Sequence, residues 1–320
     1  MNAEPEKMVH TWSRCYACFL DDIDGAMDLL GFDESRKQGV MRECIRILDR
    51  AIQDGHDREI PSWYITRVHR ILKLAAGSDL LFADLRRTCN TVGLEVAAAV
   101  KTAVAGKPRD ERLRAFMINA MAGNLLDFRT VGTGYGIDGA AARKAVEATV
   151  AAGLMIDERD AVIKLIDRAG NVLFIPDNVG EIALDKLLVD EMAAMGKQVT
   201  VPYRGGAITS DAVLADMEAV GMGEHARLII AGPDTLGISM DEMSPELETA
   251  FAAADLCITK GQANFYFVMA YMDRLAVPAI ACILTTKCRP ISQCLGHDAE
   301  RINVVTVAKV DGRPRLEPCQ

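Results

Sequence analysis

The stretch NVLFIPDNVGEIALDKLLVDEMAAMGKQVTVPY, residues 171–203, decides the fold. It opens with a short apolar run, Val172 to Ile175, which Pro176 ends, and it closes with a second strand-like run at 198–203. The residues between them, 180–195, have the amphipathic pattern of a helix. Two strands joined by a helix indicate a parallel pair, because a parallel connection has to return along the sheet.

The same alternation continues to the end of the chain. Helical stretches are predicted at 211–219, 244–254 and 263–273, and they separate runs rich in Val and Ile at 226–231, 255–259, 277–284 and 301–310. Strands with so little internal polarity are buried on both faces, so helices are expected to cover both sides of the sheet. The sequence therefore predicts an α/β fold, a three-layer α/β/α domain with a mostly parallel, Rossmann-like sheet.

The first third of the chain has a different pattern. From about residue 13 to 105, apolar residues recur at three- and four-residue spacings, as in the segment DESRKQGVMRECIRILDRAI. Gly106 and Pro108 interrupt this pattern. We therefore predict a helical N-terminal domain over 1–108, followed by the α/β/α domain over 109–320.

The composition narrows the class of partner. The chain has 320 residues, 50% of them hydrophobic, and a formal net charge of −9. Such a chain lacks the basic face that binds nucleic acid or an anionic membrane, so neither is expected as its main partner. It shows no signal-peptide pattern and no apolar run of the roughly eighteen residues that span a bilayer. The nine cysteines, an odd and scattered set, suit a reducing compartment, so we expect a cytoplasmic protein. No pattern indicates an oligomeric state.

The loops that follow the strands are where a site is expected, since open parallel sheets bind ligands at the carboxyl ends of their strands. Asp177 and Asn178 follow the first strand of the opening stretch, and Gly180 and Glu181 come just after them. Carboxylate and amide oxygens are the hard ligands that Mg²⁺ and Mn²⁺ prefer, and a glycine lets a phosphate approach a helix start. The alternative is that Asp177 or Asn178 only caps the helix.

A second carboxylate follows the next strand. Asp211 comes after Arg204 and Gly205, which belong to a flexible basic turn. At a neighbouring strand end, Asp211 could complete a divalent-metal site with the first pair. The alternative is again a helix cap, made by Asp211 or by Ser210.

Two further loops carry polar residues. Lys260 follows a strand-like run, Gly261 frees the backbone, and Asn264 lies near the start of the next helix. A lysine at that position can neutralise a phosphate, although a lysine just outside a strand is usually solvated. Asn124 and Asp127, in GNLLDF, share one face if that segment is helical.

Two other patterns are weaker. The glycines at 132, 134 and 136 mimic a nucleotide-binding loop, but no strand precedes them, so we interpret them mainly as a turn. Cys15 and Cys18 form a C-x-x-C pair, which is either half of a zinc site, a redox pair or two reduced helical cysteines. Cys44, Cys89 or Cys288 could approach this pair in space. The histidine spacings do not indicate histidine-based nucleophilic catalysis.

Taken together, DNVGE, RGGAITSDA, GNLLDF and ADLCITKGQANF resemble the metal-dependent damage-control phosphatase family, formerly domain of unknown function 89. That family also includes proteins described as acidic-residue methyltransferases. The resemblance covers nearly the whole chain, and RCYAC and TTKCRPIS are similar to its stand-alone prokaryotic branch. It implies a divalent metal ion, Mn²⁺, Mg²⁺, Co²⁺ or Ni²⁺, held by Asp177, Asn178 and Asp211. Tyr266 departs from the family, whose members commonly carry Glu there, and this difference concerns the substrate pocket or an outer contact.

The activity that the resemblance implies is hydrolysis of a small-molecule phosphate ester, either a sugar phosphate or a damaged phospho-metabolite. Asp177 and Lys260 are the expected catalytic residues, and the nucleophile is either a water at the metal or Asp177 itself. The residues expected to contact the substrate are Asn124, Asp127, Gly180, Glu181, Arg204, Gly205, Gly261 and Asn264. Two alternatives stay open. One is a non-catalytic protein that binds a metal or a phosphoester, and the other is an S-adenosylmethionine-dependent carboxyl methyltransferase.

Overall fold

Side chains of the central strands alternate between two hydrophobic cores. In strand β2 (Asn171–Ile175), Val172 and Phe174 pack on one side of the sheet, whereas Leu173 and Ile175 pack on the other. This alternation follows from the two-residue period of a strand, and it makes β2 apolar throughout because both faces are covered. The computed structural model describes residues 9–56, 59–129 and 138–316.

In this part of the chain the sheet has eight strands, in the order β1-β7-β6-β5-β2-β3-β4, with β8 paired to β7. β7 runs antiparallel to β6 and β8, and the other neighbouring pairs are parallel. The remaining strands are β1 (Ile156–Asp157), β3 (Gln198–Tyr203), β4 (Arg227–Ile230), β5 (Leu256–Lys260), β6 (Ile280–Thr285), β7 (Asn303–Val310) and β8 (Arg313–Pro314).

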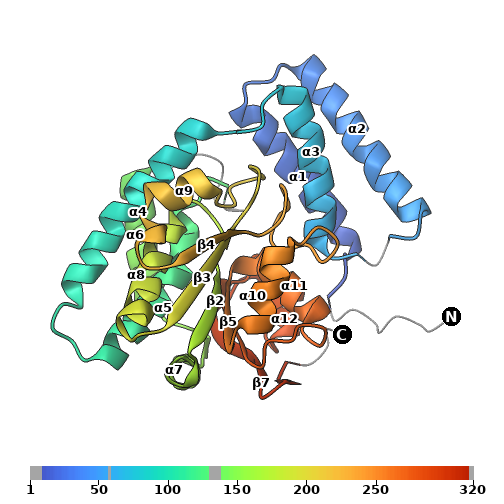
Figure 1. Cartoon of the computed structure of the whole chain (residues 1–320). Coiled ribbons are helices and arrows are strands. Elements are labelled where there is room, and N and C mark those ends of the chain that lie inside the picture. Colours follow the sequence, from blue (N-terminus) through green and yellow to red (C-terminus); the bar gives the residue numbers. More distant parts are fainter. Residues whose placement is uncertain (1–8, 57–58, 130–137, 317–320) are drawn as a thin grey trace.

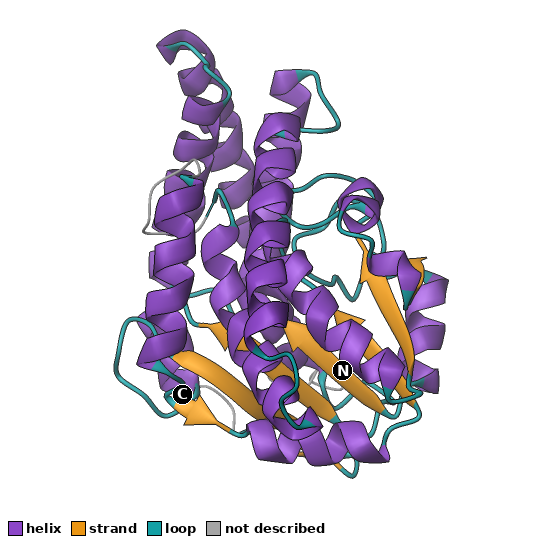
Figure 2. Cartoon of the chain, turned by 90° about the vertical axis from the view of Figure 1, so that its left-hand side faces the viewer, coloured by secondary structure: helices purple, strands orange, loops and turns teal. Residues whose placement is uncertain are grey.

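Helices cover both faces of this sheet (Figure 1). One face is covered by α4 (Ala83–Ala103), α5 (Arg109–Ala122), α6 (Gly139–Ala152), α7 (Arg159–Arg168), α8 (Glu181–Ala194) and α9 (Leu214–Ala219). Figure 2 looks onto this side, where long helices cross in front of the strands. The other face is covered by α10 (Pro245–Ala253), α11 (Gly261–Tyr271) and α12 (Arg289–Cys294). Two short 3₁₀ helices, η1 (Gly123–Leu126) and η2 (Met222–Glu224), lie in the connections.

The first three helices form a separate group, drawn in blue in Figure 1. They are α1 (Ser13–Leu29), α2 (Glu34–Gln53) and α3 (Pro61–Ala76). Their apolar faces share a third core, which includes Phe19, Tyr64 and Leu72. Helix α3 begins at Pro61, a first-turn position that proline favours, and the residue after it is Gly77, whose φ of 66° is left-handed.

Helix α4 packs differently from α1–α3. Its Val92 and Val96 belong to the core on the sheet face, and α4 and α5 both pack against α8. Gly93 brings α4 so close that a Cβ atom there would stand 2.2 Å from the carbonyl oxygen of Gly180. The boundary at residue 108 stays a prediction, but helices on both of its sides cover the same face of the sheet.

The α/β class with a mostly parallel sheet is confirmed. The strands predicted at 171–175 and 198–203 coincide with β2 and β3. The helix predicted at 211–219 begins only at Leu214, because the residues before it pair with neighbouring loops. Within the described ranges, no helix combines the length and the apolar character needed to cross a membrane.

Candidate functional site

The loops after β2 and β3 are held together by their backbones. Asn178 and Asp211 form an isolated antiparallel bridge. On either side of it, Ala212 N donates to the carbonyl of Asp177 at 3.0 Å and Val179 N donates to that of Ser210 at 2.9 Å. Adjacent parallel strands therefore deliver the three predicted metal ligands, Asp177, Asn178 and Asp211, to one place.

Neither residue of the first pair caps the following helix. The residue at the N-cap of α8 is Gly180, and no side chain caps it. Asn178 Nδ2 instead donates to Asp177 Oδ2 at 2.8 Å, and Asn178 Oδ1 accepts a hydrogen bond from Ser210 Oγ at 3.0 Å. The side chains of Asp177 and Asn178 thus face each other and the loop that carries Asp211.

The Asp177 carboxyl group is buried and only partly hydrogen-bonded. Its side chain is 4% exposed, and Oδ1 has no hydrogen-bond partner in the described part of the chain. Burial raises the pKa of Asp177 well above its ordinary value, and the nearby carboxylates of Asp211 and Glu181 raise it further. The positive charges of Lys287 and Arg204 lower the pKa of Asp177, but they do not offset these increases. A buried carboxylate in this position gains from a nearby cation.

Asp211 is oriented by its neighbours. It is fully buried, and Oδ2 accepts hydrogen bonds from Arg204 Nε and from the backbone N of Gly237, both at 2.9 Å. Within the described part of the chain, Oδ1 accepts a single long bond of 3.4 Å, from the Thr209 hydroxyl. Arg204 Nη2 also donates to Asn264 Oδ1 at 3.2 Å, so Asn264 orients Arg204. Arg204 and Gly237 therefore hold one oxygen of Asp211 in place and leave the other available.

These side chains fit a hard divalent cation. Asp177 Oδ1, Asp211 Oδ1 and Asn178 Oδ1 are oxygen donors on adjoining loops, and the first lacks any partner among residues 9–56, 59–129 and 138–316. Over the same ranges, no group of three or more His, Cys, Asp or Glu side chains is arranged to hold a metal ion. Two carboxylates and one amide make a partial shell, which suits Mg²⁺ or Mn²⁺ because such ions keep several water ligands.

Gly261 packs closely against the carboxylate of Asp177. It has a φ of 74°, and a Cβ atom there would stand 1.8 Å from Asp177 Oδ2. Only a residue without a side chain permits this approach. Of the predicted Lys260-Gly261 pair, Gly261 is therefore the residue that packs directly against Asp177.

Lys260 lies in a buried ion cluster. Its Nζ is 2.5 Å from Glu181 Oε1 and 2.7 Å from Asp185 Oδ1, and all three residues are buried. Burial raises the pKa of Asp185 to about 7, although Lys260 acts against the shift. Glu181 Oε2 accepts hydrogen bonds from Asn124 Nδ2 at 3.1 Å and Asn178 Nδ2 at 3.3 Å. The predicted role of Lys260 at a phosphate stays a prediction, since Lys260 contacts the site through Glu181.

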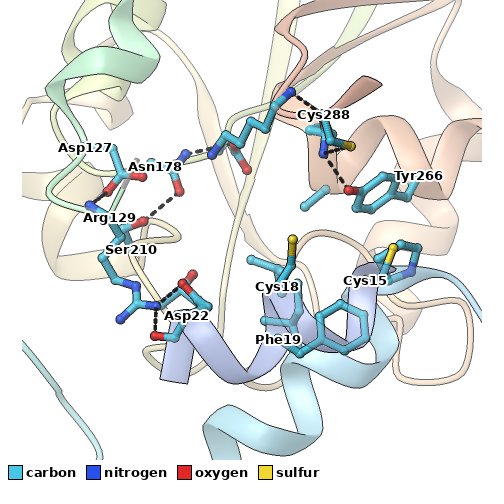
Figure 3. A pocket seen from close by; sticks show the side chains of 18 residues that line it. Cys15, Cys18, Phe19, Asp22, Asp127, Arg129, Asn178, Ser210, Tyr266 and Cys288 are labelled. Carbon is cyan, nitrogen blue, oxygen red and sulfur yellow. Dashed lines mark hydrogen bonds and ion pairs between the residues drawn. The ribbon is translucent and has the colours of Figure 1, made fainter. Parts of the chain in front are cut away.

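A cavity of about 140 Å³ opens beside this cluster. Figure 3 shows side chains of α1 on one side of it and those of the strand-end loops on the other. Of the predicted site residues, Asp127, Asp177 and Asn178 line it directly. The predicted residues that lie outside its lining are Asn124, Gly180, Glu181, Arg204, Gly205, Asp211, Lys260, Gly261 and Asn264.

Lys287 is a cation of this cavity that the sequence patterns did not single out. It follows β6, and its backbone N donates to Gln262 Oε1 at 2.6 Å. No described residue pairs with its ammonium group, which opposes the pKa increase of both Asp127 and Asp177. Its position after a strand, in TTKCRPIS, is the same signal that drew attention to Lys260.

Arg129 is a second cation in the lining. It forms an ion pair with Asp22 of α1, and Asp22 Oδ2 lies 2.7 Å from His69 Nε2 of α3. The backbone N of Arg129 donates to Asp127 Oδ1 at 2.9 Å. The N-terminal helices therefore contribute to the cavity, which sequence spacing did not predict because the contacts cross more than a hundred residues.

Two other sequence patterns have different outcomes. Cys15 and Cys18 lie in the cavity lining with Cys288, as the sequence allowed, and all three are free thiols. The glycines at 132–136 lie outside the described residues, so the structure adds no support for a nucleotide loop. Gly205 lies in the turn after β3, where its backbone N donates to the carbonyl of Gly232 at 2.9 Å.

Comparison with known proteins identifies the family. The family model described as the damage-control phosphatase ARMT1-like domain matches residues 11–302. The chain belongs to this family. Its fold is shared by a DUF89 family protein of Pyrococcus horikoshii, whose crystal structure matches with a TM-score of 0.79 over 93% of this chain and 99% of that chain, at 22% identity.

Curated relatives of this ARMT1-like chain come from archaea. A damage-control phosphatase of Archaeoglobus fulgidus is 28% identical over 88% of this chain and 94% of its own length. A damage-control phosphatase of Pyrococcus horikoshii is 29% identical over 78% of this chain and 83% of its own length. An uncharacterized protein of Methanocaldococcus jannaschii is 29% identical over 89% of this chain and 91% of its own length.

Proposed function

We propose that this ARMT1-like chain is a metal-dependent phosphomonoester hydrolase that acts on a small phosphorylated metabolite. The observation that carries the proposal is the buried Asp177 oxygen that has no partner in the described part of the chain. Asp177 lies near the carboxylates of Asp211 and Glu181, and it lines a cavity that Lys287 also lines. The family and the names of the two archaeal relatives support a phosphatase in general terms.

Asp177, Asn178 and Asp211 would hold the divalent cation, Mn²⁺, Mg²⁺, Co²⁺ or Ni²⁺. When bound, such an ion supplies Lewis-acid polarisation of a phosphoryl oxygen. Arg204 and Gly237 keep Asp211 fixed, since both donate to its Oδ2. The site is then organised before the substrate arrives, which is what electrostatic catalysis requires.

Cations of the chain itself would neutralise the phosphate. Lys287 lines the cavity together with Asp177, and its ammonium has no partner among the described side chains. A phosphate that enters there would receive charge-assisted hydrogen bonds as negative charge develops on the transferred group. Lys260, paired with Glu181 and Asp185, would instead offset the charge of the carboxylates behind the site.

The test is hydrolysis of 4-nitrophenyl phosphate after metal removal and after addition of each of the four cations. We expect activity only with a cation, and we expect Asp177→Ala and Asp211→Ala to lose at least about a hundredfold in kcat/KM. Asp79→Ala, which removes an exposed carboxylate remote from the site, is the matched control. Calorimetric titration with Mn²⁺ reports binding separately from turnover.

The outcomes separate the candidates. Activity without added cation, or unchanged turnover in both variants, would contradict the proposal. Manganese binding that depends on Asp177, without hydrolysis of any phosphate ester, would identify the non-catalytic binding protein. A phosphorylated Asp177, trapped by acid quenching and found by mass spectrometry, would identify this residue as the nucleophile.

A further inference from the structure

The two sides of the cavity differ in chemistry. In Figure 3, Asp127, Asn178, Arg129 and Ser210 gather on one side. Asp177, which accepts a hydrogen bond from Asn178, and Lys287, whose charge acts to lower the pKa of Asp127 and Asp177, also line the cavity. The opposite side carries a different set of labelled side chains, Tyr266, Phe19, Cys15, Cys18 and Cys288. Pro61, Ile65, Leu236 and Ala263 add further apolar lining. A phosphate bound among the charged groups would therefore direct the rest of its ester toward an apolar wall.

The three thiols of this wall are neutral at physiological pH. Burial raises the pKa of Cys15 to about 11, and it raises the pKa of Cys18 and Cys288 as well. A protonated thiol behaves as a small, polarisable apolar group and is only a weak hydrogen-bond donor. These cysteines thus extend the apolar surface made by Phe19 and Ile65.

The amide of Gln262 on this side is already engaged. Gln262 Oε1 accepts the hydrogen bond from Lys287 N at 2.6 Å, and its Nε2 donates to the Tyr266 hydroxyl at 2.5 Å. Tyr266 is 8% exposed, and burial raises the pKa of its phenol well above the ordinary value, so the ring stays uncharged. Gln262 thus fixes the ring of Tyr266 as one wall of the cavity.

A leaving group with many hydroxyls would lose water here without full replacement. Each buried hydroxyl that lacks a hydrogen-bond partner weakens binding. An apolar or aromatic group would instead gain from leaving water and from contact with the Tyr266 ring and the thiols. The apolar side of the described lining therefore favours an apolar leaving group over a sugar, because it offers few hydrogen-bond partners for sugar hydroxyls.

We propose that this site prefers phosphate monoesters with an apolar or aromatic leaving group over sugar phosphates, and that Tyr266 is a specificity-determining residue. The inference rests on the proposed function, because it assigns the phosphate to the charged side of the cavity. The proposed preference narrows the substrate class, because the family resemblance covers both sugar phosphates and other phosphorylated metabolites.

The experiment compares benzyl phosphate with glucose 6-phosphate in the presence of Mn²⁺. Both are esters of primary alcohols, so intrinsic leaving-group reactivity differs little between them. We expect kcat/KM for benzyl phosphate to exceed that for glucose 6-phosphate by about tenfold or more, chiefly through KM. Tyr266→Phe keeps the preference because the ring remains, whereas Tyr266→Gln reduces it by about fivefold or more.

Two further variants guard against a folding artefact. Tyr271→Gln makes the same change on the same helix, at a ring that lies outside the cavity lining, and should leave the ratio unchanged. Leu236→Asn adds a polar group to the apolar wall and should lower the ratio even if Tyr266→Gln fails to fold.

Equal kcat/KM values for the two esters, or a ratio that neither Tyr266→Gln nor Leu236→Asn changes, would overturn the inference and leave the proposed function standing. If neither these esters nor 4-nitrophenyl phosphate is hydrolysed, the proposed function fails. In that case calorimetry measures the affinity of the protein for benzylphosphonate and for methylphosphonate. Tighter binding of benzylphosphonate supports the preference for apolar groups, and equal affinities refute it.

Discussion

The carboxylate of Asp177 lies against the Cα atom of Gly261, with Oδ2 only 1.8 Å from the position that a Cβ atom would occupy. The first residue follows β2 and the second opens α11 after β5, and these two strands are neighbours in the sheet. Asp177 therefore keeps its position only if residue 261 has no side chain. The contact ties the geometry of the proposed metal site to the pairing of two strands.

Gly261→Ala is expected to remove activity. The methyl group has to displace Asp177, and a displacement of about 1 Å at a reacting group costs on the order of a hundredfold in rate. Gly196→Ala is the control, because Gly196 also has a positive φ, 80°, but open space around it. It should cost about 1–2 kcal/mol of stability from backbone strain alone, with normal kcat/KM. Equal losses of activity in the two variants would contradict the packing argument.

Gly93→Ala is expected to disturb the contact between α4 and the start of α8. Its methyl group would meet the Gly180 carbonyl oxygen at 2.2 Å, and overpacking of this kind costs about 1–3 kcal/mol or more. The matching change in another helix, Gly39→Ala in α2, meets nothing within 4 Å and should stabilise the protein by about 0.5–1 kcal/mol. Urea unfolding of both variants tests the opposite signs.

Lys260→Met should leave Glu181 and Asp185 as buried carboxylates without their cation. Removal of one partner from a buried ion pair costs about 3–5 kcal/mol at pH 7.5. The cost should shrink at pH 5, because burial raises the pKa of Asp185 to about 7 and protonation below that pH removes its charge. Lys309→Met is the comparison, since the ammonium of this buried lysine donates to the carbonyls of Met272 and Leu275. Asp273 is the one nearby carboxylate that acts on Lys309 among the described residues, so the loss should depend less on pH than the loss in Lys260→Met. Denaturant unfolding at both pH values measures the difference.

His69 should make the protein less stable in acid. Burial is the main cause that lowers its pKa, and the hydrogen bond with Asp22 only partly opposes it. Below a pH of about 6.5 the unfolded chain therefore binds a proton that the folded chain does not, so the free energy of unfolding falls as pH decreases. His69→Gln should reduce this slope by up to about 1.4 kcal/mol per pH unit. Parallel slopes for the wild type and the variant, measured by urea unfolding from pH 8 to 5, would refute the assignment.

Much of the fold was readable from local patterns. The runs at 171–175 and 198–203 predicted β2 and β3 to the residue, because a strand buried on both faces has to be apolar throughout. The meeting of Asp177 with Asp211 was also predictable, since parallel neighbours end at the same edge of a sheet. The start of α9 was misplaced by three residues, because Asp211 pairs with Asn178 across the sheet.

The sequence did not predict which lysine lines the cavity. Lys260 and Lys287 both follow strands, and the sequence drew attention to the first. The structure turns Lys260 toward Glu181 and Asp185 of α8, whereas Lys287 lines the cavity. Asp22 and Cys18, far away in the N-terminal helices, also reach the lining.

Local patterns in the sequence were enough to predict the strand and helix periods, the loops that carry oxygen-bearing side chains, and the family that these loops resemble. Tertiary packing was needed to show which charges compensate one another and which residues form the apolar wall beside Tyr266. The difference lies in the distance along the chain over which each property is set. Hydrophobic periodicity is a property of consecutive residues, whereas the burial and pairing of a charge depend on side chains that folding brings from distant segments.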